Sequence, residues 1–416
     1  MTVLGALEVT ECRACGAPLG PVFCDLGRMP VANSYVPNAE AARREPAFPL
    51  RALVCTGCRL VQLDTVVDEV GIFEDYAYFS SMSDGWVAHA GRFAAEMALR
   101  LGLGPGSLVI EAASNDGYLL RHFLAAGIPC LGIEPARNVA EVARAAGVPT
   151  EARFLGRATA AEIVAARGRA ADLVVANNVL AHVPDVNDFA AGLAVLAGEA
   201  GIVSIEAPHL IAMVDGVQFD TIYHEHYAYW SLHAMEGLLA RHGLVVFDVE
   251  RLPTHGGSLR VFSSAAPRRG SARLADVRAE EAARGVARDE FYRGFDARAQ
   301  RVVAGFRAWL AAARAEGRRI GAYGAAAKGN TLLNAAGVRA GDILAVADRS
   351  PAKQGRLLPG SHVPVVTPEA LLALGLDDIL ILPWNIAREV AGQLRGAGFA
   401  GRLLVAVPEM REVAPR

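Results

Sequence analysis

The stretch Ser107-Leu-Val-Ile-Glu111-Ala-Ala-Ser-Asn115-Asp116-Gly117-Tyr118 decides the fold of this 416-residue chain. An apolar run ends at a glutamate and leads into a turn of small residues, after which a helix is expected. Such a turn at the carboxyl end of a strand lets the backbone approach a bound ligand closely. The sequence therefore predicts an α/β unit whose ligand binds at the edge of its sheet.

Further apolar runs follow at the spacing of an α/β fold. The strand expected from Cys130 to Glu134 begins about 20 residues later and also ends in a carboxylate, the position that binds both ribose hydroxyls in doubly wound sheets. Residues 172–182 and 201–208 contain two more strands. Because helices are expected between these strands, the pattern predicts a mainly parallel sheet.

The last two strands expected in this unit lie at 244–252 and 258–263, on either side of Thr254-His255-Gly256-Gly257. Adjacent strands without a helix between them predict an antiparallel hairpin at the sheet edge. Such an ending is unusual for a nicotinamide-binding fold and suits a class I methyltransferase.

Cysteines near the start of the chain indicate a metal site. Cys12-x-x-Cys15 and Cys55-x-x-Cys58 are two knuckles separated by a proline-rich segment. Their thiolates predict a closed, structural zinc site, whose apparent binding free energy of about 10 to 16 kcal/mol helps to fold a small, core-poor region. A disulfide or thioredoxin-like redox centre is the alternative, and it is disfavoured because no βαβ pattern follows. Cys24 is a spare thiol, and Cys130 is expected in the core.

Groups that can move protons gather in the segment Phe219-Asp-Thr-Ile-Tyr223-His224-Glu225-His226-Tyr-Ala-Tyr-Trp-Ser231. In an extended segment the two imidazoles would share one side and the carboxylate would take the other. This spacing differs from the helical His-Glu-x-x-His zinc motif. For the tripeptide alone, a buried aromatic turn is the competing interpretation. Upstream, the aromatic connector from Phe73 to Trp86 either packs domains together or leans Tyr76 and Tyr78 over this site.

Composition limits the partners of the chain. A formal net charge of −3 provides no basic field, so we expect no nucleic acid partner. The first 16 residues do not show a basic start followed by an apolar run, and no stretch suits a membrane span, so a soluble, cytoplasmic protein is expected. Lysine occurs only at positions 328 and 353, which makes a chemical role for the remaining lysines more plausible than in a lysine-rich chain.

A second α/β unit is expected after a charged, helical bridge at 267–316. It begins with a strand at 319–324 and the turn Ala325-Ala-Ala-Lys328-Gly329-Asn330-Thr331. The glycine spacing fits neither the dinucleotide fingerprint nor the P-loop. The turn nevertheless combines a helix N-terminus with a cation at a strand end, where an anion binds favourably. A tightly packed turn with an exposed lysine is the alternative.

Taken together, the cysteine knuckles, the turn from Glu111 to Tyr118, and the segments IYHEHYAYWSL and GAAAKGNTLLN resemble the zinc-containing, S-adenosylmethionine (SAM)-dependent C-methyltransferases of deoxysugar biosynthesis. The resemblance covers essentially the whole chain. It implies that SAM is cradled by the turn, with Glu134 on its ribose, Phe154 against adenine and Asn177 beneath the methionine part. The cradle residues that it implies are Glu111, Ala113, Asn115, Asp116 and Gly117. Ala113 stands where such enzymes usually carry glycine, so we expect the turn to avoid a positive φ there.

The resemblance also implies the substrate, a dTDP-linked 4-keto-6-deoxyhexose methylated on the carbon next to its ketone. The best candidate is C-3 of a 3-amino-2,3,6-trideoxy-4-keto sugar, in the biosynthesis of a branched-chain deoxysugar of a natural product, and methylation at C-5 or at a non-amino C-3 stays open. Alkylation of this carbon requires an enolate. The site must therefore supply a positioned base that removes the proton and hydrogen-bond donors that stabilise the charge on the keto oxygen. We assign His226 as the base, oriented by Glu225, with Tyr223, Tyr76 and His182 as candidate donors. The candidate substrate contacts are Tyr78, His224, Lys328 and Asn330.

The sequence thus predicts an α/β protein with a zinc-binding domain (1–70), a class I methyltransferase Rossmann-like domain (71–265), and a helical bridge with a second Rossmann-like domain (266–416) that completes the sugar-nucleotide site. A monomer is expected. A nicotinamide-dependent ketoreductase would show GxGxxG spacing and a Tyr-x-x-x-Lys pair, which this chain lacks. A non-catalytic SAM or nucleotide sensor would leave the proton-handling segment unexplained. A zinc-dependent nucleic-acid methyltransferase would need a basic surface.

Overall fold

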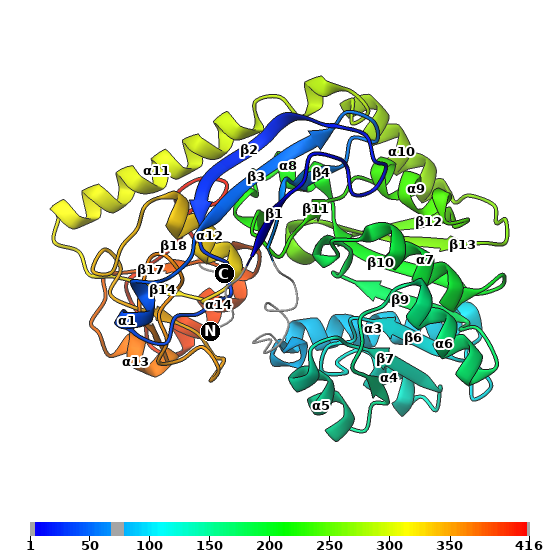
Figure 1. Ribbon diagram of the computed structural model, residues 1–416. Helices are drawn as coiled ribbons and strands as arrows, with labels where there is room; N and C mark the ends of the chain where they lie inside the picture. Colours follow the sequence, from blue (N-terminus) through cyan, green and yellow to red (C-terminus); the bar gives the residue numbers. More distant parts are fainter. Residues whose placement is uncertain (1–4, 68–78, 414–416) are drawn as a thin grey trace.

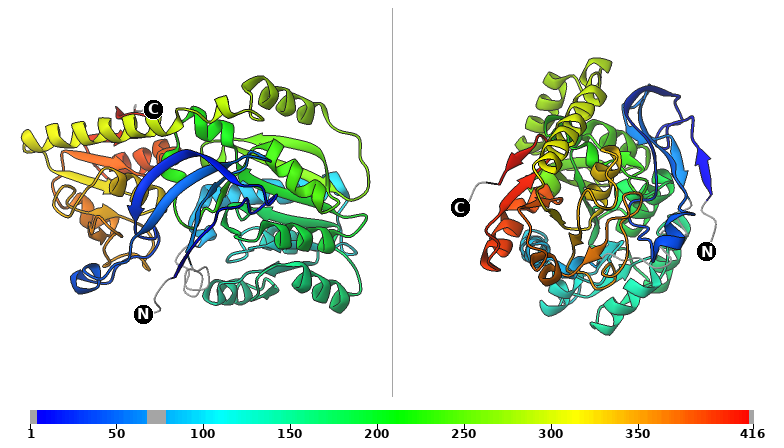
Figure 2. Two further views of the ribbon diagram at one scale, coloured as in Figure 1. Left: turned by 45° about the horizontal axis from the view of Figure 1, so that its top comes forward. Right: turned by 90° about the vertical axis from the view of Figure 1, so that its left-hand side faces the viewer.

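The computed structural model describes residues 5–67 and 79–413. Figure 1 shows two α/β units with a long β-hairpin, β2 and β3, that reaches from one unit to the other. The two views of Figure 2 show the same hairpin lying along the long helix α11. Within the described ranges, no helix is both long and apolar enough to cross a membrane.

The first α/β unit contains a seven-stranded sheet in the described part of the chain, in the order β12-β13-β10-β9-β6-β7-β8. The strands β8, β7, β6, β9 and β10 pair in parallel, whereas β13 pairs antiparallel with both β10 and β12. The hairpin expected at the sheet edge is therefore confirmed. The strands are β6 (Val109–Ala112), β7 (Cys130–Ile133), β8 (Thr150–Glu151), β9 (Leu173–Asn177), β10 (Ile202–Pro208), β12 (Val245–Leu252) and β13 (Ser258–Ser264).

Helices cover this sheet because its central strands are apolar on both faces. All residues of β6, β7 and β9 are buried. The helix α3 begins at Asp84, where the Ser83 side chain accepts a hydrogen bond from the Trp86 amide, and ends before Gly102 in the left-handed conformation. The helices of this unit are α3 (Asp84–Leu101), α4 (Leu120–Ala125), α5 (Arg137–Ala145), α6 (Arg157–Arg167), α7 (Val186–Ala197), α8 (Leu210–Asp215) and α9 (Leu232–Arg241).

The N-terminal region forms a four-stranded antiparallel sheet, among the described residues, in the order β11-β4-β3-β2. Its edge strand β11 comes from a distant part of the chain, and Ala228 and Tyr229 pair with Gln62 and Val61 of β4. This pairing attaches the segment that follows His226 to the cysteine-containing region. The elements here are β1 (Ala6–Glu8), β2 (Leu19–Met29), α1 (Ala39–Ala42), β3 (Phe48–Cys55), β4 (Val61–Leu63), β5 (Thr65–Val67) and β11 (Ala228–Tyr229).

The C-terminal unit has a mainly parallel sheet in the order β16-β15-β14-β17-β18-β19. The expected helical bridge is present as α10 and α11, and Phe23 of β2 stacks on Phe295 of α11 with ring centroids 4.2 Å apart. A continuous core therefore joins the N-terminal hairpin to the C-terminal sheet. The elements are α10 (Ala272–Arg284), α11 (Phe295–Ala315), β14 (Ile320–Tyr323), α12 (Ala327–Ala335), β15 (Val346–Ala347), β16 (Val365–Val366), α13 (Pro368–Leu372), β17 (Asp378–Ile381), α14 (Ala387–Gly396), β18 (Arg402–Val405) and β19 (Arg411–Glu412).

Six short 3₁₀ turns connect the elements of the described chain, three of them directly after strands β9, β12 and β17. They are η1 (Ser80–Met82), η2 (Leu180–His182), η3 (Phe219–Thr221), η4 (Thr254–Gly256), η5 (Asp289–Phe291) and η6 (Trp384–Ile386).

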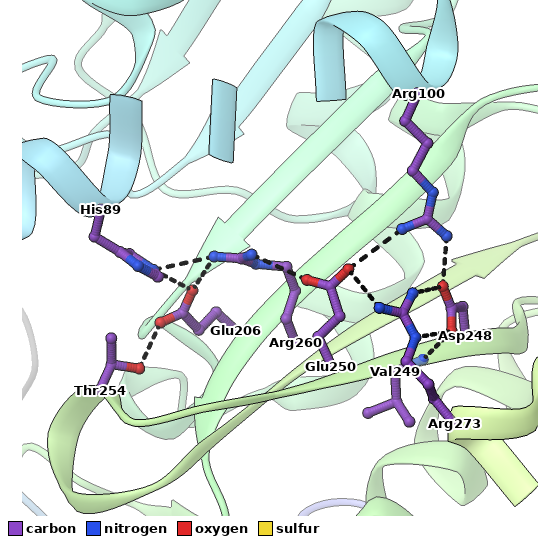
Figure 3. Close-up of polar contacts among 9 residues, drawn as sticks. All are labelled: His89, Arg100, Glu206, Asp248, Val249, Glu250, Thr254, Arg260 and Arg273. Carbon is purple, nitrogen blue, oxygen red and sulfur yellow. Dashed lines mark hydrogen bonds and ion pairs between the residues drawn. The ribbon is translucent and has the colours of Figure 1, made fainter. Parts of the chain in front are cut away.

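A buried ionic network fixes α3 to the β10–β13 edge of the sheet (Figure 3). Glu206 of β10 has a fully buried side chain that accepts a hydrogen bond from Arg260 of β13 at 2.7 Å, and His89 Nε2 of α3 lies 3.0 Å from the same carboxylate. The Thr254 hydroxyl donates to the other oxygen at 2.9 Å. Arg260 also bonds Glu250 at 3.1 Å, and the network continues outward through Arg100, Arg273 and Asp248.

We predict that Arg260→Met lowers the free energy of unfolding by about 3 to 5 kcal/mol, because it leaves the Glu206 carboxylate buried without its cation. Arg251→Met, on the neighbouring strand, removes an exposed ion pair to Glu280 and should cost less than about 1 kcal/mol. Urea denaturation followed by circular dichroism compares the two variants. Equal stabilities would show that the buried pair does not hold this edge together.

Candidate active site

Buried polar atoms without hydrogen-bond partners in the described part of the chain line the edge of the seven-stranded sheet at the carboxyl ends of its parallel strands. The Glu111 carboxyl group, at the end of β6, is fully buried; the Tyr118 side chain lies near it, but no described residue donates to it with ordinary hydrogen-bond geometry. Burial raises its pKa well above the ordinary value, and the charges of Glu134 and Asp116 act in the same direction. Buried polar groups are normally hydrogen-bonded, so these atoms fit the amino-acid and ribose parts of a bound SAM. The other such atoms are Ser114 Oγ, Asp116 Oδ1, Asn177 Oδ1, Asn178 Nδ2 and Asn178 Oδ1.

The turn after β6 corrects one expectation. Ala113 has a φ of 52° and Asn115 a φ of 49°, so the backbone is left-handed at Ala113 although no glycine is present. Hydrogen bonds from the Ser114 amide to the Ile133 carbonyl (3.2 Å) and from the Asn115 amide to Glu134 Oε2 (2.9 Å) hold this conformation. These bonds offset the cost of about 1 to 2 kcal/mol for a left-handed residue with a Cβ. Gly117 is also left-handed, and a Cβ there would lie 2.7 Å from Val148 Cγ2.

Glu134, at the end of β7, is oriented by the backbone. Its Oε1 accepts a hydrogen bond from the Ala136 amide and its Oε2 from the Asn115 amide, both at 2.9 Å. Burial raises the pKa of this carboxyl to about 7 despite these two donors. The remaining lone pairs agree with the expected ribose contact, which stays a prediction. Phe154 follows β8 and is 47% exposed, as a residue that stacks on a bound base could be.

The proton-handling segment forms a turn, as in the competing interpretation, so the side-chain arrangement described for an extended segment does not apply. The His226 amide donates to the Tyr223 carbonyl at 2.8 Å, which closes a turn over residues 223–226. The Tyr223 hydroxyl lies 2.5 Å from His226 Nε2, while His226 Nδ1 lies 2.9 Å from the Thr221 carbonyl. Because a carbonyl only accepts, Nδ1 carries the hydrogen and Nε2 accepts from Tyr223. Thr221 therefore orients His226, and the expectation that Glu225 does so is wrong.

The turn sends His224 and Glu225 to other partners. His224 Nε2 donates to the Pro49 carbonyl at 3.1 Å and its ring packs edge-on against Phe48, so it supports β3 and does not share a face with His226. Glu225 Oε1 accepts a hydrogen bond from Asn33 Nδ2 at 3.0 Å. Burial raises the pKa of Glu225 to about 7.

Further histidines gather around His226. The His182 ring lies edge-on to the His226 ring with centroids 4.6 Å apart, and His182 Nδ1 has no partner within the described ranges. Burial lowers the pKa of His182 and of His255 to about 4, and it lowers that of His226 well below its ordinary value. All three imidazoles are therefore neutral near pH 7. The positive charge of Lys328 also lowers the pKa of His226 and of His255.

The C-terminal unit contributes Lys328 and Trp384 to this site. Lys328 Nζ is buried, lies 4.8 Å from the centroid of the Trp384 ring, and has no hydrogen-bond partner among the described residues. Trp384 Nε1 donates to Asp220 Oδ2 at 2.7 Å. Burial lowers the pKa of Lys328 below its ordinary value, and the negative charge of Asp220 acts in the opposite direction. The exposed lysine considered in the alternative interpretation is thus excluded. Asn330, the other expected contact of this turn, donates from Nδ2 to the Ala32 carbonyl at 2.6 Å and supports the helix instead.

Sequence reasoning did not assign Asn178, Asp220, His255 or Trp384 to the site. The clearest pattern that could have identified one of them is Thr254-His255-Gly256-Gly257, a histidine beside two glycines between strands. Asn178 directly follows the expected Asn177. Tyr76 and Tyr78, expected to lean over the site, lie outside the described residues.

The cysteine cluster has the geometry of a tetrahedral metal site. The ligand atoms of Cys12, Cys15, Cys55 and Cys58 lie within 4.8 Å of one another, and the Cys12–Cys58 and Cys15–Cys55 sulfurs are 3.6 and 3.4 Å apart. Tetrahedral zinc with Zn–S bonds of about 2.3 Å needs sulfurs about 3.8 Å apart, so these residues fit the ion. The amides of Gly57 and Cys58 donate to Cys55 Sγ, and the Cys58 thiol lowers the pKa of Cys12 to about 5.

Family profiles match successive parts of the chain: a zinc binding domain over residues 12–73, a methyltransferase domain over residues 86–249, and a C-methyltransferase C-terminal domain over residues 253–408. The chain is also 35% identical to the C-methyltransferase NovU of Streptomyces niveus over 410 residues, which is 98% of this chain and 97% of that protein. The chain belongs to the C-methyltransferase family. It is a SAM-dependent C-methyltransferase with a zinc-binding domain.

Solved structures resemble parts of this methyltransferase. The magnesium protoporphyrin IX methyltransferase of Synechocystis, with bound SAH, is 16% identical, covers 43% of this chain and 83% of its own, and has a TM-score of 0.35. The 1,6-didemethyltoxoflavin-N1-methyltransferase of Burkholderia thailandensis is 18% identical, covers 45% and 84%, and has a TM-score of 0.32. Likenesses of this size do not identify a substrate.

We predict that purified methyltransferase contains about one equivalent of zinc and that Cys55→Ser removes it and lowers the melting temperature, because metal binding contributes to folding. Cys130→Ala, which alters a core thiol outside the cluster, should keep the zinc. Metal analysis and thermal denaturation measure both effects. Full folding and activity after replacement of all four cluster cysteines by serine would contradict a structural zinc site.

We also predict that Glu134→Ala weakens SAM binding by about 1.5 to 3 kcal/mol, the scale of hydrogen bonds to a charged group. Because the pKa of Glu134 is about 7 and its ionised form is the better acceptor, wild-type affinity should rise as the pH increases through 7, and the variant should lose this dependence. Isothermal titration calorimetry measures both, with Glu141→Ala on the exposed face of α5 as the control. An unchanged affinity would remove Glu134 from the site.

Proposed function

We propose that this methyltransferase transfers a methyl group from SAM to a carbon next to the ketone of a dTDP-linked 4-keto-6-deoxyhexose. The best candidate is C-3 of a 3-amino-2,3,6-trideoxy-4-keto sugar, with C-5 and a non-amino C-3 as alternatives. The resemblance of the segments around Tyr223 and Lys328 to deoxysugar C-methyltransferases supports this substrate class. The position of these residues between a SAM-binding sheet edge and a second α/β unit supports it as well.

The Tyr223–His226 pair is the observation that carries the chemistry. A carbon atom next to a ketone becomes a nucleophile only after its proton is removed, and the base must be neutral and positioned. His226 meets both conditions because Thr221 fixes its tautomer and burial keeps the ring unprotonated at neutral pH. The Tyr223 hydroxyl donates a hydrogen bond to His226 Nε2 at 2.5 Å and would relay the substrate proton to the imidazole.

The reaction then proceeds in two balanced steps. The substrate proton passes by way of the Tyr223 hydroxyl to His226 Nε2, and the electron pair of the C–H bond becomes an enolate. The enolate carbon then forms the new C–C bond to the methyl group. SAM, when bound, would supply this electrophilic methyl group, whose bond to the sulfonium breaks with the electron pair staying on sulfur. The partly buried cluster of His182, His226 and His255 limits access of water to the enolate, and the zinc site takes no part in these steps.

We predict that His226→Asn leaves SAM and substrate binding intact and lowers turnover by about 10² to 10⁴, the range for removal of a general base. Exchange of the substrate α-proton with deuterated solvent should fall in parallel, because exchange reports deprotonation without methyl transfer. The exchange is followed by NMR, and His233→Asn, on the exposed face of α9, is the control.

An exchange rate equal to that of the wild type in His226→Asn would assign the base to another group. The Tyr223→Phe and His182→Asn variants would then be tested in the same assay. Weakened substrate binding with unchanged exchange from the bound state would instead show that His226 is a sugar contact.

A further inference from the structure

The proposed reaction places negative charge on the keto oxygen, and the site contains a cation that no described residue neutralises by direct contact. Lys328 Nζ is buried yet lacks a hydrogen-bond partner within residues 5–67 and 79–413. Its neighbours are the face of Trp384 and the Asp220 carboxylate, which is bonded to the Trp384 indole. An unpaired buried cation is costly, so its retention indicates that it acts on a bound anionic group.

The helix that carries Lys328 is fixed to the catalytic segment. The Thr331 hydroxyl donates to the Ile222 carbonyl at 3.1 Å, one residue before Tyr223. The Asn330 amide bonds the Ala32 carbonyl at 2.6 Å. Gly329 lets the helix pack closely on the residue after β17 in its own unit, because a Cβ there would lie 2.7 Å from Leu382 Cδ1. The position of Lys328 relative to Tyr223 and His226 is therefore fixed. Lys328 can contact only a substrate group that binds next to these two residues.

His255 approaches the same region from the methyltransferase unit in a strained conformation. Its backbone is left-handed, with φ 54° and ψ 22°, which is unfavourable for a residue with a Cβ. The Thr254 hydroxyl bonds the buried Glu206 (Figure 3), and Gln218 Nε2 donates to the Gly256 carbonyl at 2.8 Å, so both flanks of His255 are anchored. A Cβ on Gly256 would meet Trp384 at 2.5 Å, which places this turn directly against the indole beside Lys328.

The His255 ring also faces the cofactor side of the site. It lies edge-on to Trp86 with centroids 5.2 Å apart, and Trp86 stacks on Tyr118, which follows the SAM-binding turn. The ring therefore stands between the SAM-binding edge and Trp384. Strain that is held in place by its surroundings is typical of functional positions.

We propose that Lys328 and His255 stabilise the enolate oxygen, Lys328 by its charge and His255 as a neutral hydrogen-bond donor. The proposal rests on the proposed function and assigns Lys328 to the keto oxygen rather than to the diphosphate. As the proton passes from the carbon to His226, negative charge develops on the keto oxygen. Lys328 of the C-terminal unit and His255 of the methyltransferase unit stabilise this charge. The charge returns to the carbon when the new C–C bond forms, and the ketone is restored.

The test measures solvent deuterium exchange of dTDP-4-keto-6-deoxyglucose by NMR, in the presence of S-adenosylhomocysteine, together with the affinity for dTDP alone. Lys328→Met should lower the exchange rate of the bound sugar by about 10² to 10³, the scale for loss of an oxyanion donor. The Kd for dTDP should stay within about twofold, because methionine removes no diphosphate contact. The variant should still fold, since Asp220 can take up a proton when the neighbouring cation is gone.

Two further variants complete the test. His255→Gly should lower exchange by about 10- to 100-fold without loss of folding, because glycine adopts the left-handed conformation without strain. Lys353→Met, at the only other lysine of the chain, removes a cation that is paired with Asp348 and should leave the exchange of the bound sugar close to wild type.

The outcomes separate this inference from the proposed function. Exchange by the wild type together with unchanged exchange in Lys328→Met and His255→Gly would overturn the inference alone. A tenfold or greater loss of dTDP affinity in Lys328→Met, with normal exchange from the bound state, would show that Lys328 contacts the diphosphate. This result would also overturn the inference. Absence of exchange in the wild type, both with this sugar and with a dTDP-linked 3-amino-2,3,6-trideoxy-4-keto sugar, would overturn the 4-keto sugar substrate and the inference with it.

Discussion

The hydrogen bonds that hold residues 219–229 between the parts of the molecule are the constraint on which the rest of the structure depends. The segment pairs with the zinc-binding region through β11 and β4, and the Leu63 amide donates to the Tyr227 carbonyl. It joins the methyltransferase unit where the Tyr227 amide donates to the Ala181 carbonyl at 2.7 Å. The C-terminal unit reaches it through Thr331 and Trp384. His226 is thus positioned by all of these parts at once.

This arrangement explains how a structural metal can matter to the chemistry without touching it. Arg13, between two of the zinc-binding cysteines, donates to the carbonyls of Pro184 and Leu63 and lies over the Tyr227 ring. Closure of the knuckles by zinc consequently fixes β4, and β4 fixes the strand that follows His226. Loss of the metal is therefore expected to loosen β4 and the strand β11 that follows His226.

Features that depend on local sequence could be predicted, and features that depend on distant partners could not. The strand ends at Glu111 and Glu134, the final hairpin and the cysteine knuckles follow from apolar runs and ligand spacing within short stretches. The side-chain directions within the turn at Tyr223 to His226 could not be predicted, because they are set by Pro49, Asn33 and Thr221. Likewise, Ala113 is left-handed because a neighbouring strand and Glu134 hold its turn, against the preference of alanine.

The central claim is that this site methylates carbon next to the ketone of a nucleotide sugar. The most direct measurement is a mass-spectrometric screen of the purified protein with SAM and a panel of dTDP-linked 4-keto sugars, followed by NMR of any product. The account predicts that one sugar gains a single methyl group, attached to carbon adjacent to C-4. Methylation of an oxygen or nitrogen atom, or no methyl gain by any 4-keto sugar while SAM binds normally, would contradict it.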